Sequence, residues 1–185
     1  VETVLMHYND RSTVCISSQA GCAMDCRFCA TGQAGFDRQR TTGEIVEEVI
    51  RAATRSAPTR VSNIVFMGMG EPLYNFENVR DAMKIAMDPE GIQLSRRRIT
   101  LSTSGVVPEI ARTATEIGCL LAVSFHGTTD EVRDKLVPIN KRWNLEALLD
   151  ALRDYPKVSN SERITFEYVM LKGVNDTDED AHRLV

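Results

Sequence analysis

The chain has 185 residues, which fits one domain with room for a hydrophobic core. Apolar residues make up 43% and charged residues 26%, so collagen-like, mucin-like and wholly disordered classes are excluded. The 22 basic residues against 26 acidic ones give a net charge of −4, which provides no overall electrostatic attraction for nucleic acid. We expect one domain over residues 1–185.

The chain carries no signal for a membrane or for secretion. Its longest largely apolar segment, 119–125, is far shorter than the ~20 residues that a membrane-spanning helix needs. No charged segment followed by an apolar core stands at its start. Five cysteines are an odd number, and three of them fall between 22 and 29, which favours a metal or redox centre over a secreted disulfide framework. We expect a cytoplasmic protein without membrane contact.

Strand-like apolar runs alternate with helical patterns along the chain. The predicted strands, rich in Val, Ile, Leu and Phe, are 13–18, 63–68, 98–102, 120–125 and 164–171. A capping box at 41–44 begins a helix over about 42–55. Further helices are predicted after Asn75, from Pro108 to a stop at Gly118, after Asn144, and from Asp176 or Thr177 onward.

Strands that are each followed by a helix predict an α/β fold with a parallel sheet and right-handed crossovers. The sheet is either doubly wound or rolled into a full or partial barrel, and periodicity leaves this open. In each case ligands bind beyond the carboxyl ends of the strands. The loops that begin after Ser18, Met67, Ser102 and Ser124 are therefore expected to line the site.

A loop with three thiols follows the first of these strands. Cys22, Cys26 and Cys29 have spacings of four and three, which suit one corner of a 4Fe–4S cluster whose fourth iron has no protein ligand. A zinc site that recruits Cys15 or Cys119 is one alternative. A thioredoxin-like dithiol formed by the CxxC segment 26–29 is another, and the cluster is favoured.

Polar and glycine-rich segments follow the next strands. The segment 68–72 holds Gly70 and Glu71; it is either a ligand-binding turn, in which the glycines let the backbone approach and Glu71 binds an amino group, or simply a tight strand-to-helix turn. Ser102 and Ser124 suit hydrogen bonds to a ribose or a carboxylate. His126 is favoured as a positioned donor over a catalytic base.

The cysteine spacing followed by Gly70-Glu71-Pro72 resembles the radical S-adenosylmethionine (SAM) superfamily. The wider strings CISSQAGC at 15–22, FMGMGEPL at 66–73, LSTSG at 101–105 and VPINK at 137–141 resemble one branch, the RlmN/Cfr group of RNA adenine methyltransferases, and within it the RlmN type. The resemblance extends over the whole chain. It implies a partial (β/α)6 barrel core, incomplete at its C-terminal end.

The resemblance also implies two cofactors and the residues that bind them. Cys22, Cys26 and Cys29 match the ligands of a 4Fe–4S cluster, whose remaining iron binds SAM and whose electron cleaves it to a 5′-deoxyadenosyl radical. The matching SAM contacts are Gly70, Glu71, Ser102, Ser124, Phe125 and His126.

In the RlmN/Cfr group, one SAM methylates a cysteine and a second SAM generates the radical that transfers this carbon to adenine. Cys15 matches the resolving cysteine, which releases the product by forming a disulfide; on sequence alone it is a buried strand thiol. Glu2 matches the group's proton acceptor. The methyl-carrying cysteine and a SAM-contacting asparagine would follow Val185, and a helical RNA-contacting domain would precede Val1. Cys119 is expected in the core.

The implied substrate is 23S ribosomal RNA, methylated on carbon 2 of an adenine, with tRNA as a second substrate. Glu71-Pro72 and the segment 102–105 favour carbon 2 over the carbon-8 reaction of the Cfr type. The implied partner is an electron donor such as flavodoxin, and we expect a monomer. The alternatives are the carbon-8 enzyme, another radical SAM enzyme and a zinc-stabilised binding module.

Basic residues give little further support for RNA binding. The run 96–98 precedes a strand, so we expect it at the opposite end from the site, as a solvated face. Arg38, Arg40, Lys141 and Arg142 lie in loops nearer the site and are predicted to contact phosphates.

Overall fold

The computed structural model describes residues 1–9, 11–156 and 163–185. A six-stranded sheet has the order β1-β2-β5-β6-β7-β8, and β3–β4 form a separate pair. Five strands of the large sheet run parallel: β2 (Ser12–Cys15), β5 (Val61–Phe66), β6 (Ile99–Thr103), β7 (Leu120–Ser124) and β8 (Thr165–Glu167). Each falls within or overlaps one of the five segments predicted as strands.

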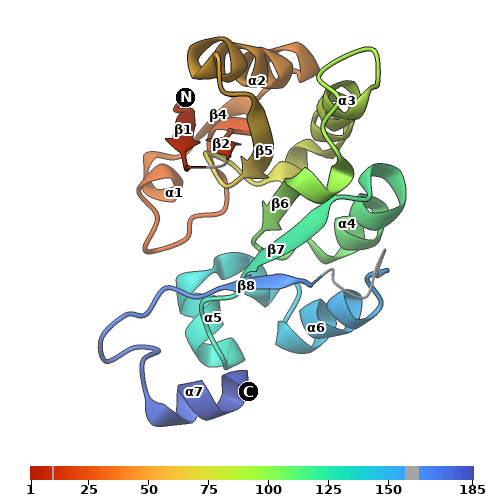
Figure 1. Cartoon of the computed structure of the whole chain (residues 1–185). Coiled ribbons are helices and arrows are strands. Elements are labelled where there is room, and N and C mark those ends of the chain that lie inside the picture. Colours follow the sequence, from red (N-terminus) through yellow and green to blue (C-terminus); the bar gives the residue numbers. More distant parts are fainter. Residues whose placement is uncertain (10, 157–162) are drawn as a thin grey trace.

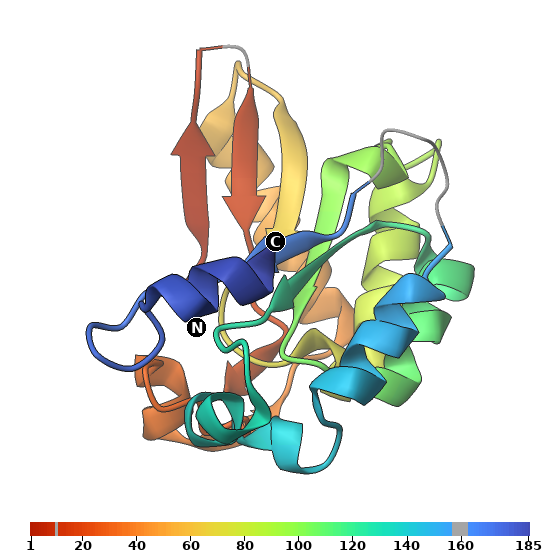
Figure 2. The ribbon, with the colours of Figure 1, turned by 90° about the horizontal axis from the view of Figure 1, so that it is seen from below.

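Helices cover one face of the large sheet. They are α2 (Thr42–Ser56), α3 (Phe76–Met87), α4 (Val107–Arg112) and α6 (Leu145–Arg153), and they follow the outside of the curved sheet (Figures 1 and 2). A one-sided helical layer is the arrangement of a partial barrel, since a doubly wound fold has helices on both faces. The predicted α/β fold is therefore confirmed, with five parallel strands of a (β/α)6 core among the described residues.

Apolar side chains from strands and helices meet in one core. Val14, Ile64 and Leu101 are fully buried in neighbouring strands. On α2, Ile45 and Val49 lie one turn apart and are also buried. Each such side chain contributes about 1.5–3 kcal/mol through the apolar surface it removes from water.

The predicted helix ends are largely confirmed. Thr41 and Glu44 form the capping box of α2, and Asn144 caps α6 by accepting a hydrogen bond from the Ala147 backbone. The helix that begins near Pro108 continues as a π-turn, η3 (Thr113–Ile117), and ends at Gly118 in the left-handed conformation. Asn75 precedes α3 as predicted, but its side chain does not cap that helix.

Several elements were not predicted. They are β1 (Val4–His7), which pairs with β2 antiparallel, the hairpin β3 (Gln19–Gly21)–β4 (Phe36–Gln39), and the short helices α1 (Ala30–Ala34) and α5 (Asp130–Leu136). In the part of the chain that the structure describes, short single turns join the larger elements: η1 (Pro72–Asn75), η2 (Arg96–Arg98), η3 and η4 (Pro138–Lys141). All four residues of β4 are exposed, so this strand has no apolar periodicity that could reveal it.

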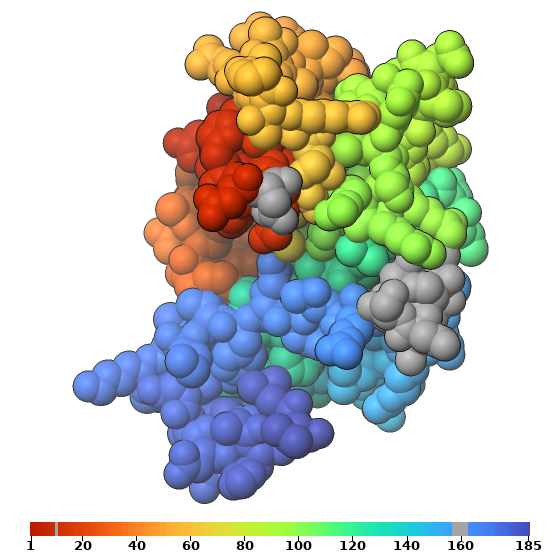
Figure 3. Space-filling view, in the orientation of Figure 1, coloured from red at the N-terminus to blue at the C-terminus, as the bar shows by residue number. Residues whose placement is uncertain are grey.

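The last predicted strand, 164–171, is too long. β8 ends at Glu167, and the chain then projects from the body of the molecule before α7 (Asp178–Leu184) begins (Figure 3). Met170, in this projecting segment, is 77% exposed. Among the described helices, none has the length and apolar character needed to cross a membrane.

Candidate active site

A pocket of about 190 Å³ opens at the carboxyl ends of β5, β6, β7 and β8. The loops predicted to begin after Ser18, Met67, Ser102 and Ser124 all contribute residues to its lining. Its chemically distinctive lining residues are Cys22, Cys26, Cys29, Gly70, Glu71, Ser102, Ser104, Ser124, His126 and Glu167.

The cysteine loop, residues 22–35, is closed at its base by the β3–β4 hairpin. The Cys22 backbone N–H donates to the Gly35 carbonyl oxygen over 2.9 Å. A Cβ on Gly21 would lie 2.1 Å from that same oxygen, so only glycine allows the closure. On the other side of the loop, the Arg27 N–H donates to the Leu136 carbonyl oxygen of α5 over 3.1 Å. These contacts turn the loop toward the strand ends.

The three thiols of the loop all face the same pocket. Cys22 and Cys26 are buried, and burial raises the pKa of both thiols, that of Cys26 to about 12. A hydrogen bond from the Ser104 hydroxyl partly opposes the shift at Cys26. Metal ions bind the thiolate form, so loading these ligands would release protons.

The donor set fits an iron–sulfur cluster better than a single zinc ion. Cys15 and Cys119 do not line the pocket. Across residues 1–9, 11–156 and 163–185, no three His, Cys, Asp or Glu side chains are grouped so that they could hold one metal ion. All five cysteines are free, including Cys26 and Cys29. Three thiols spread around one pocket would, once deprotonated, suit a cluster with one open iron.

The turn after β5 brings backbone close to the pocket. A Cβ on Gly70 would lie 2.5 Å from Cβ of Gln19, and its φ of +100° also requires glycine. A Cβ on Gly68 would lie 2.7 Å from the Ile16 carbonyl oxygen. Both glycines are therefore needed for this turn to pack against the segment that follows β2.

Glu71 is almost fully buried and links this turn to the end of β6. Its carboxylate accepts hydrogen bonds from the Ser104 N–H (2.7 Å), the Thr103 hydroxyl (2.9 Å) and the Leu73 N–H (3.1 Å). Burial raises its pKa, and these hydrogen bonds oppose the shift. Glu71 thus holds the turn after β5 and the end of β6 together at the rim of the pocket.

Glu167 at the end of β8 joins the two predicted serines. Its Oε2 accepts from the Ser102 hydroxyl over 2.6 Å and from the Ser124 hydroxyl over 3.1 Å. Sequence reasoning missed this residue. Its one signal was a carboxylate within an otherwise apolar predicted strand.

His126 is buried at the rim in a left-handed backbone conformation (φ 55°). The Val169 N–H donates to its Nδ1 over 3.1 Å, so the ring proton is on Nε2. Burial lowers the pKa of His126 to about 4, so the ring is neutral near pH 7. This arrangement favours the predicted donor role over a base.

Phe125 lies differently from the other predicted contacts. It does not line the pocket, and its ring packs edge-on against Phe166 with centroids 5.3 Å apart. Its N–H donates to the Glu167 carbonyl oxygen, and its own carbonyl accepts from Arg133. Any contribution to ligand binding would therefore be through the position of its backbone.

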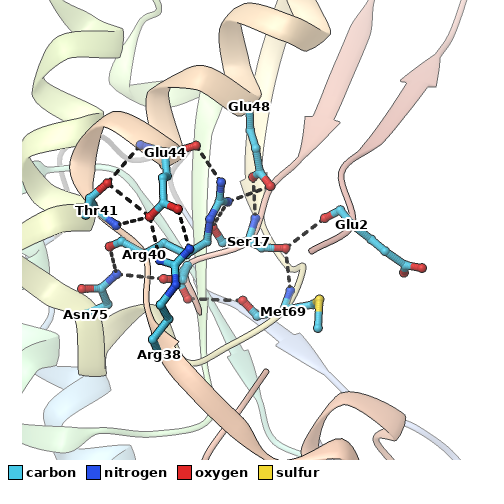
Figure 4. Close-up of polar contacts among 10 residues, drawn as sticks. Glu2, Ser17, Arg38, Arg40, Thr41, Glu44, Glu48, Met69 and Asn75 are labelled. Atoms are coloured by element: carbon cyan, nitrogen blue, oxygen red, sulfur yellow. Dashed lines mark hydrogen bonds and ion pairs between the residues drawn. The ribbon is translucent and has the colours of Figure 1, made fainter. Parts of the chain in front are cut away.

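Cys15 and Glu2 lie beside the pocket and do not line it. The half-buried Cys15 thiol receives a hydrogen bond from the backbone of Met67, a lining residue, and burial raises its pKa. Glu2 is exposed; its carbonyl oxygen accepts from the Ser17 hydroxyl over 2.9 Å, and its carboxylate points away from the other residues of Figure 4. The structure thus brings both near the strand ends.

Arg40 was predicted to contact phosphate, and this is wrong. It is buried and pairs with Glu48 at 2.7 Å, while its Nη1 donates to the Ser17 carbonyl oxygen over 2.9 Å (Figure 4). Arg38 pairs with Glu44 at 2.7 Å on the surface. Arg40 therefore fixes the segment after β2 and cannot reach an external anion.

Cys119 is 4% exposed, and burial raises its pKa to about 12, which confirms the predicted core position. It borders a second cavity of about 320 Å³ at the amino end of β7, lined mainly by apolar side chains. The run 96–98 is exposed at that same end, as predicted.

Comparisons with known proteins agree with this geometry. Residues 16–185 match the radical SAM superfamily. The chain is 69% identical to the dual-specificity RNA methyltransferase RlmN of Dinoroseobacter shibae and 69% identical to that of Ruegeria pomeroyi; all of this chain and 50% of each relative are covered. The crystal structure of a radical SAM methyltransferase from Sphaerobacter thermophilus has a TM-score of 0.93 and 48% identity, over 98% of this chain and 54% of that one. The chain spans about half the length of the curated relatives it matches.

Proposed function

The chain belongs to the radical SAM superfamily, and from this premise we propose that it is the catalytic core of an RNA methyltransferase of the RlmN type. The superfamily uses a 4Fe–4S cluster and SAM. The observation that carries the proposal is the convergence of three loop thiols and four strand ends on one pocket. Residues 1–185 would form the radical SAM domain of a longer protein.

Cys22, Cys26 and Cys29 would hold the cluster, which supplies the electron that cleaves the SAM sulfonium. The Ser104 hydroxyl is placed to hydrogen-bond the Cys26 sulfur. The Glu71 carboxylate accepts a hydrogen bond from the Ser104 N–H over 2.7 Å, so Ser104 is held in place beside Cys26 before any ligand binds.

SAM would bind across the rim. Gly70 allows close approach of backbone carbonyls that suit the SAM amino group, with the Glu71 carboxylate beneath them. Ser102 and Ser124, oriented by Glu167, suit its hydroxyls or carboxylate. His126 offers its Nε2 proton, and Phe125 sets the backbone between them.

The substrate would be an adenine of 23S ribosomal RNA, methylated on carbon 2, with tRNA as a second substrate. The name of the relatives, dual-specificity RNA methyltransferase, is consistent with two RNA substrates. Cys15 would resolve the covalent RNA adduct and Glu2 would accept the proton. The reaction would take place in the cytoplasm, in a monomer that receives electrons from a donor such as flavodoxin.

The test uses the full-length protein that contains this chain. Anaerobic reconstitution is expected to give a brown protein with about four irons, and incubation with SAM, reductant and 23S rRNA is expected to give an adenine methylated on carbon 2 by mass spectrometry. Methylation on carbon 8 would indicate the Cfr-type reaction. Zinc uptake without iron uptake would reject the proposal in favour of a binding module.

Two variants test the assigned roles. Cys15→Ala is expected to keep the cluster and SAM cleavage but to accumulate a covalent protein–RNA adduct. Glu2→Gln is expected to slow release of methylated RNA. Normal turnover in either variant would remove the role assigned to that residue.

A further inference from the structure

Arg133 of α5 is a completely buried arginine that the proposed reaction does not use. Its exposed fraction is 0%, and it is the largest of the fully buried side chains. Arginine is rarely buried unless its charge is paired. The groups around it must therefore offset the cost of burying its charge.

The guanidinium group ties α5 to the ends of two central strands. Nε donates to the Phe125 carbonyl oxygen over 2.9 Å, and Nη2 donates to the Ser104 and Ser124 carbonyl oxygens over 2.7 and 3.2 Å. Nη1 donates to Oδ1 of Asn140 over 2.8 Å. Four of its five N–H groups are thus directed to fixed acceptors.

None of these acceptors carries a charge. The nearest carboxylates in the network are one link away, because the Asn140 amide donates to Asp130 over 2.8 Å and to Asp134 over 2.7 Å. Burial lowers the pKa of Arg133 to about 10, and among its neighbours Cys26 opposes this shift most. A buried cation, bonded only to neutral groups, is thus linked to a proposed cluster ligand through Ser104, whose carbonyl oxygen accepts from Arg133 and whose hydroxyl bonds to Cys26.

Arg133 cannot touch a ligand in the pocket, since it is fully buried and does not line it. It can act through its charge and through the backbone that it holds. That backbone includes Ser104, whose hydroxyl bonds to Cys26, and Ser124, which lines the rim. Both routes lead to the proposed cluster and SAM sites.

We propose that Arg133 is a positioning residue whose buried positive charge raises the reduction potential of the cluster proposed at Cys22, Cys26 and Cys29. The inference rests on the proposed function, because it requires the cluster. When the cluster takes up one electron from a reductant, its negative charge increases by one, and a nearby cation stabilises the reduced state more than the oxidised state. Asn140 of the segment VPINK (137–141) would then position this charge, because its side chain bonds to Arg133 on one side and to Asp130 and Asp134 on the other.

The experiment is a potentiometric titration of the full-length reconstituted protein with dithionite, followed by EPR of the reduced cluster. In Arg133→Gln, the ratio of reduced to oxidised cluster at a fixed applied potential is expected to fall about tenfold, which is about 59 mV for a one-electron couple. Arg133→Lys keeps the charge and is expected to stay close to wild type. Arg153→Gln, which removes a charge from a 70% exposed side chain, is the matched control and is expected to show no shift.

A variant that is expected to shift the reduction potential in the opposite direction separates the effect of charge from that of lost structure. Asp134→Asn keeps an oxygen that can accept from Asn140 but removes a negative charge near Arg133, so the ratio is expected to rise about two- to threefold. Asp134→Asn also tests the inference if the Arg133→Gln variant fails to fold. An unchanged potential in Asp134→Asn, or equal potentials in Arg133→Gln and Arg133→Lys, would overturn the inference. A wild-type protein that takes up no iron would instead overturn the proposed function.

Discussion

The cysteine loop (residues 22–35) and the strand-end rim (Glu71, Ser102, Ser124, His126 and Glu167) line the same pocket but are held in different ways. The rim is fixed by hydrogen bonds that its side chains accept, such as the three that the buried Glu71 carboxylate accepts from the Leu73 N–H, the Thr103 hydroxyl and the Ser104 N–H. The loop is fixed through its backbone, at Gly35 and at Leu136, while its buried thiols have raised pKa values at Cys22 and Cys26.

This difference indicates which region depends on a cofactor. A carboxylate with three protein donors is oriented by the fold, so the rim is arranged in advance of ligand binding. Thiols whose ionisation is suppressed by burial become good ligands only when a metal displaces their protons. We therefore expect removal of the metal to disturb the loop and to leave the rim largely unchanged.

The largest effect is expected from loss of a loop thiol. Cys26→Ala in the full-length protein should lower iron content from about four per chain to near zero and abolish SAM cleavage. Cys119→Ala is the control, because that buried thiol lies outside the pocket and its loss should cost only about 1 kcal/mol of stability. Iron analysis and 5′-deoxyadenosine assay make the comparison, and full iron content in Cys26→Ala would contradict it.

The turn that leads into the rim residue Glu71 should be intolerant of even one added methyl group. Gly70→Ala would place Cβ 2.5 Å from Cβ of Gln19 at a φ of +100°, so a loss of about 2–4 kcal/mol is expected together with weaker SAM binding. Gly173→Ala has a φ of +72° but nothing within 4 Å of its Cβ, and only about 1 kcal/mol is expected. Urea unfolding of both variants tests this, and equal losses would show that the rim is not tightly packed.

The neutral state of His126 gives the rim a pH dependence. Its pKa is about 4 in the fold against 6.5 ordinarily, so its contribution to stability is present above pH 6.5 and is lost as the pH falls toward 4. Allowing for partial solvent screening, we expect the stability of wild type relative to His126→Gln to fall by about 2 kcal/mol between pH 7 and pH 4. Denaturant titrations at the two pH values measure this, and a constant difference would show that His126 is not neutral by burial.

The fold was predictable wherever apolar periodicity was strong. The five parallel strands and the capping boxes of α2 and α7 follow from local patterns, because both depend on neighbours in the sequence. The β3–β4 hairpin was not predictable in this way, since its strands are short and β4 is fully exposed. α5 was overlooked although Thr129 caps it and Val132 and Leu136 lie four residues apart.

In the candidate site, too, features set by local sequence patterns could be predicted and features set by distant partners could not. Its location followed from topology, and the cysteines from their spacing. Arg40 could not be distinguished from a surface cation, because its partner Glu48 lies on α2 and only the tertiary fold shows that both are buried. Arg133 and Glu167 were missed for the same reason, since their partners are 7 to 65 residues away in the chain.

Substitution of Glu167 tests how far side-chain hydrogen bonds fix the rim, and it has the smallest expected effect of the four predictions. In Glu167→Gln the shared acceptor of Ser102 and Ser124 loses its negative charge, so the hydrogen bonds that orient the two hydroxyls weaken while the strand pairing stays intact. A loss of about 1.4 kcal/mol in SAM affinity, or tenfold in Kd, is expected by calorimetry under anaerobic conditions. Glu90→Gln, at an exposed turn, should leave Kd unchanged. An unaltered Kd in Glu167→Gln would mean that the serines bind SAM without orientation by Glu167, and the rim would then be less fixed by side-chain contacts than its hydrogen bonds indicate.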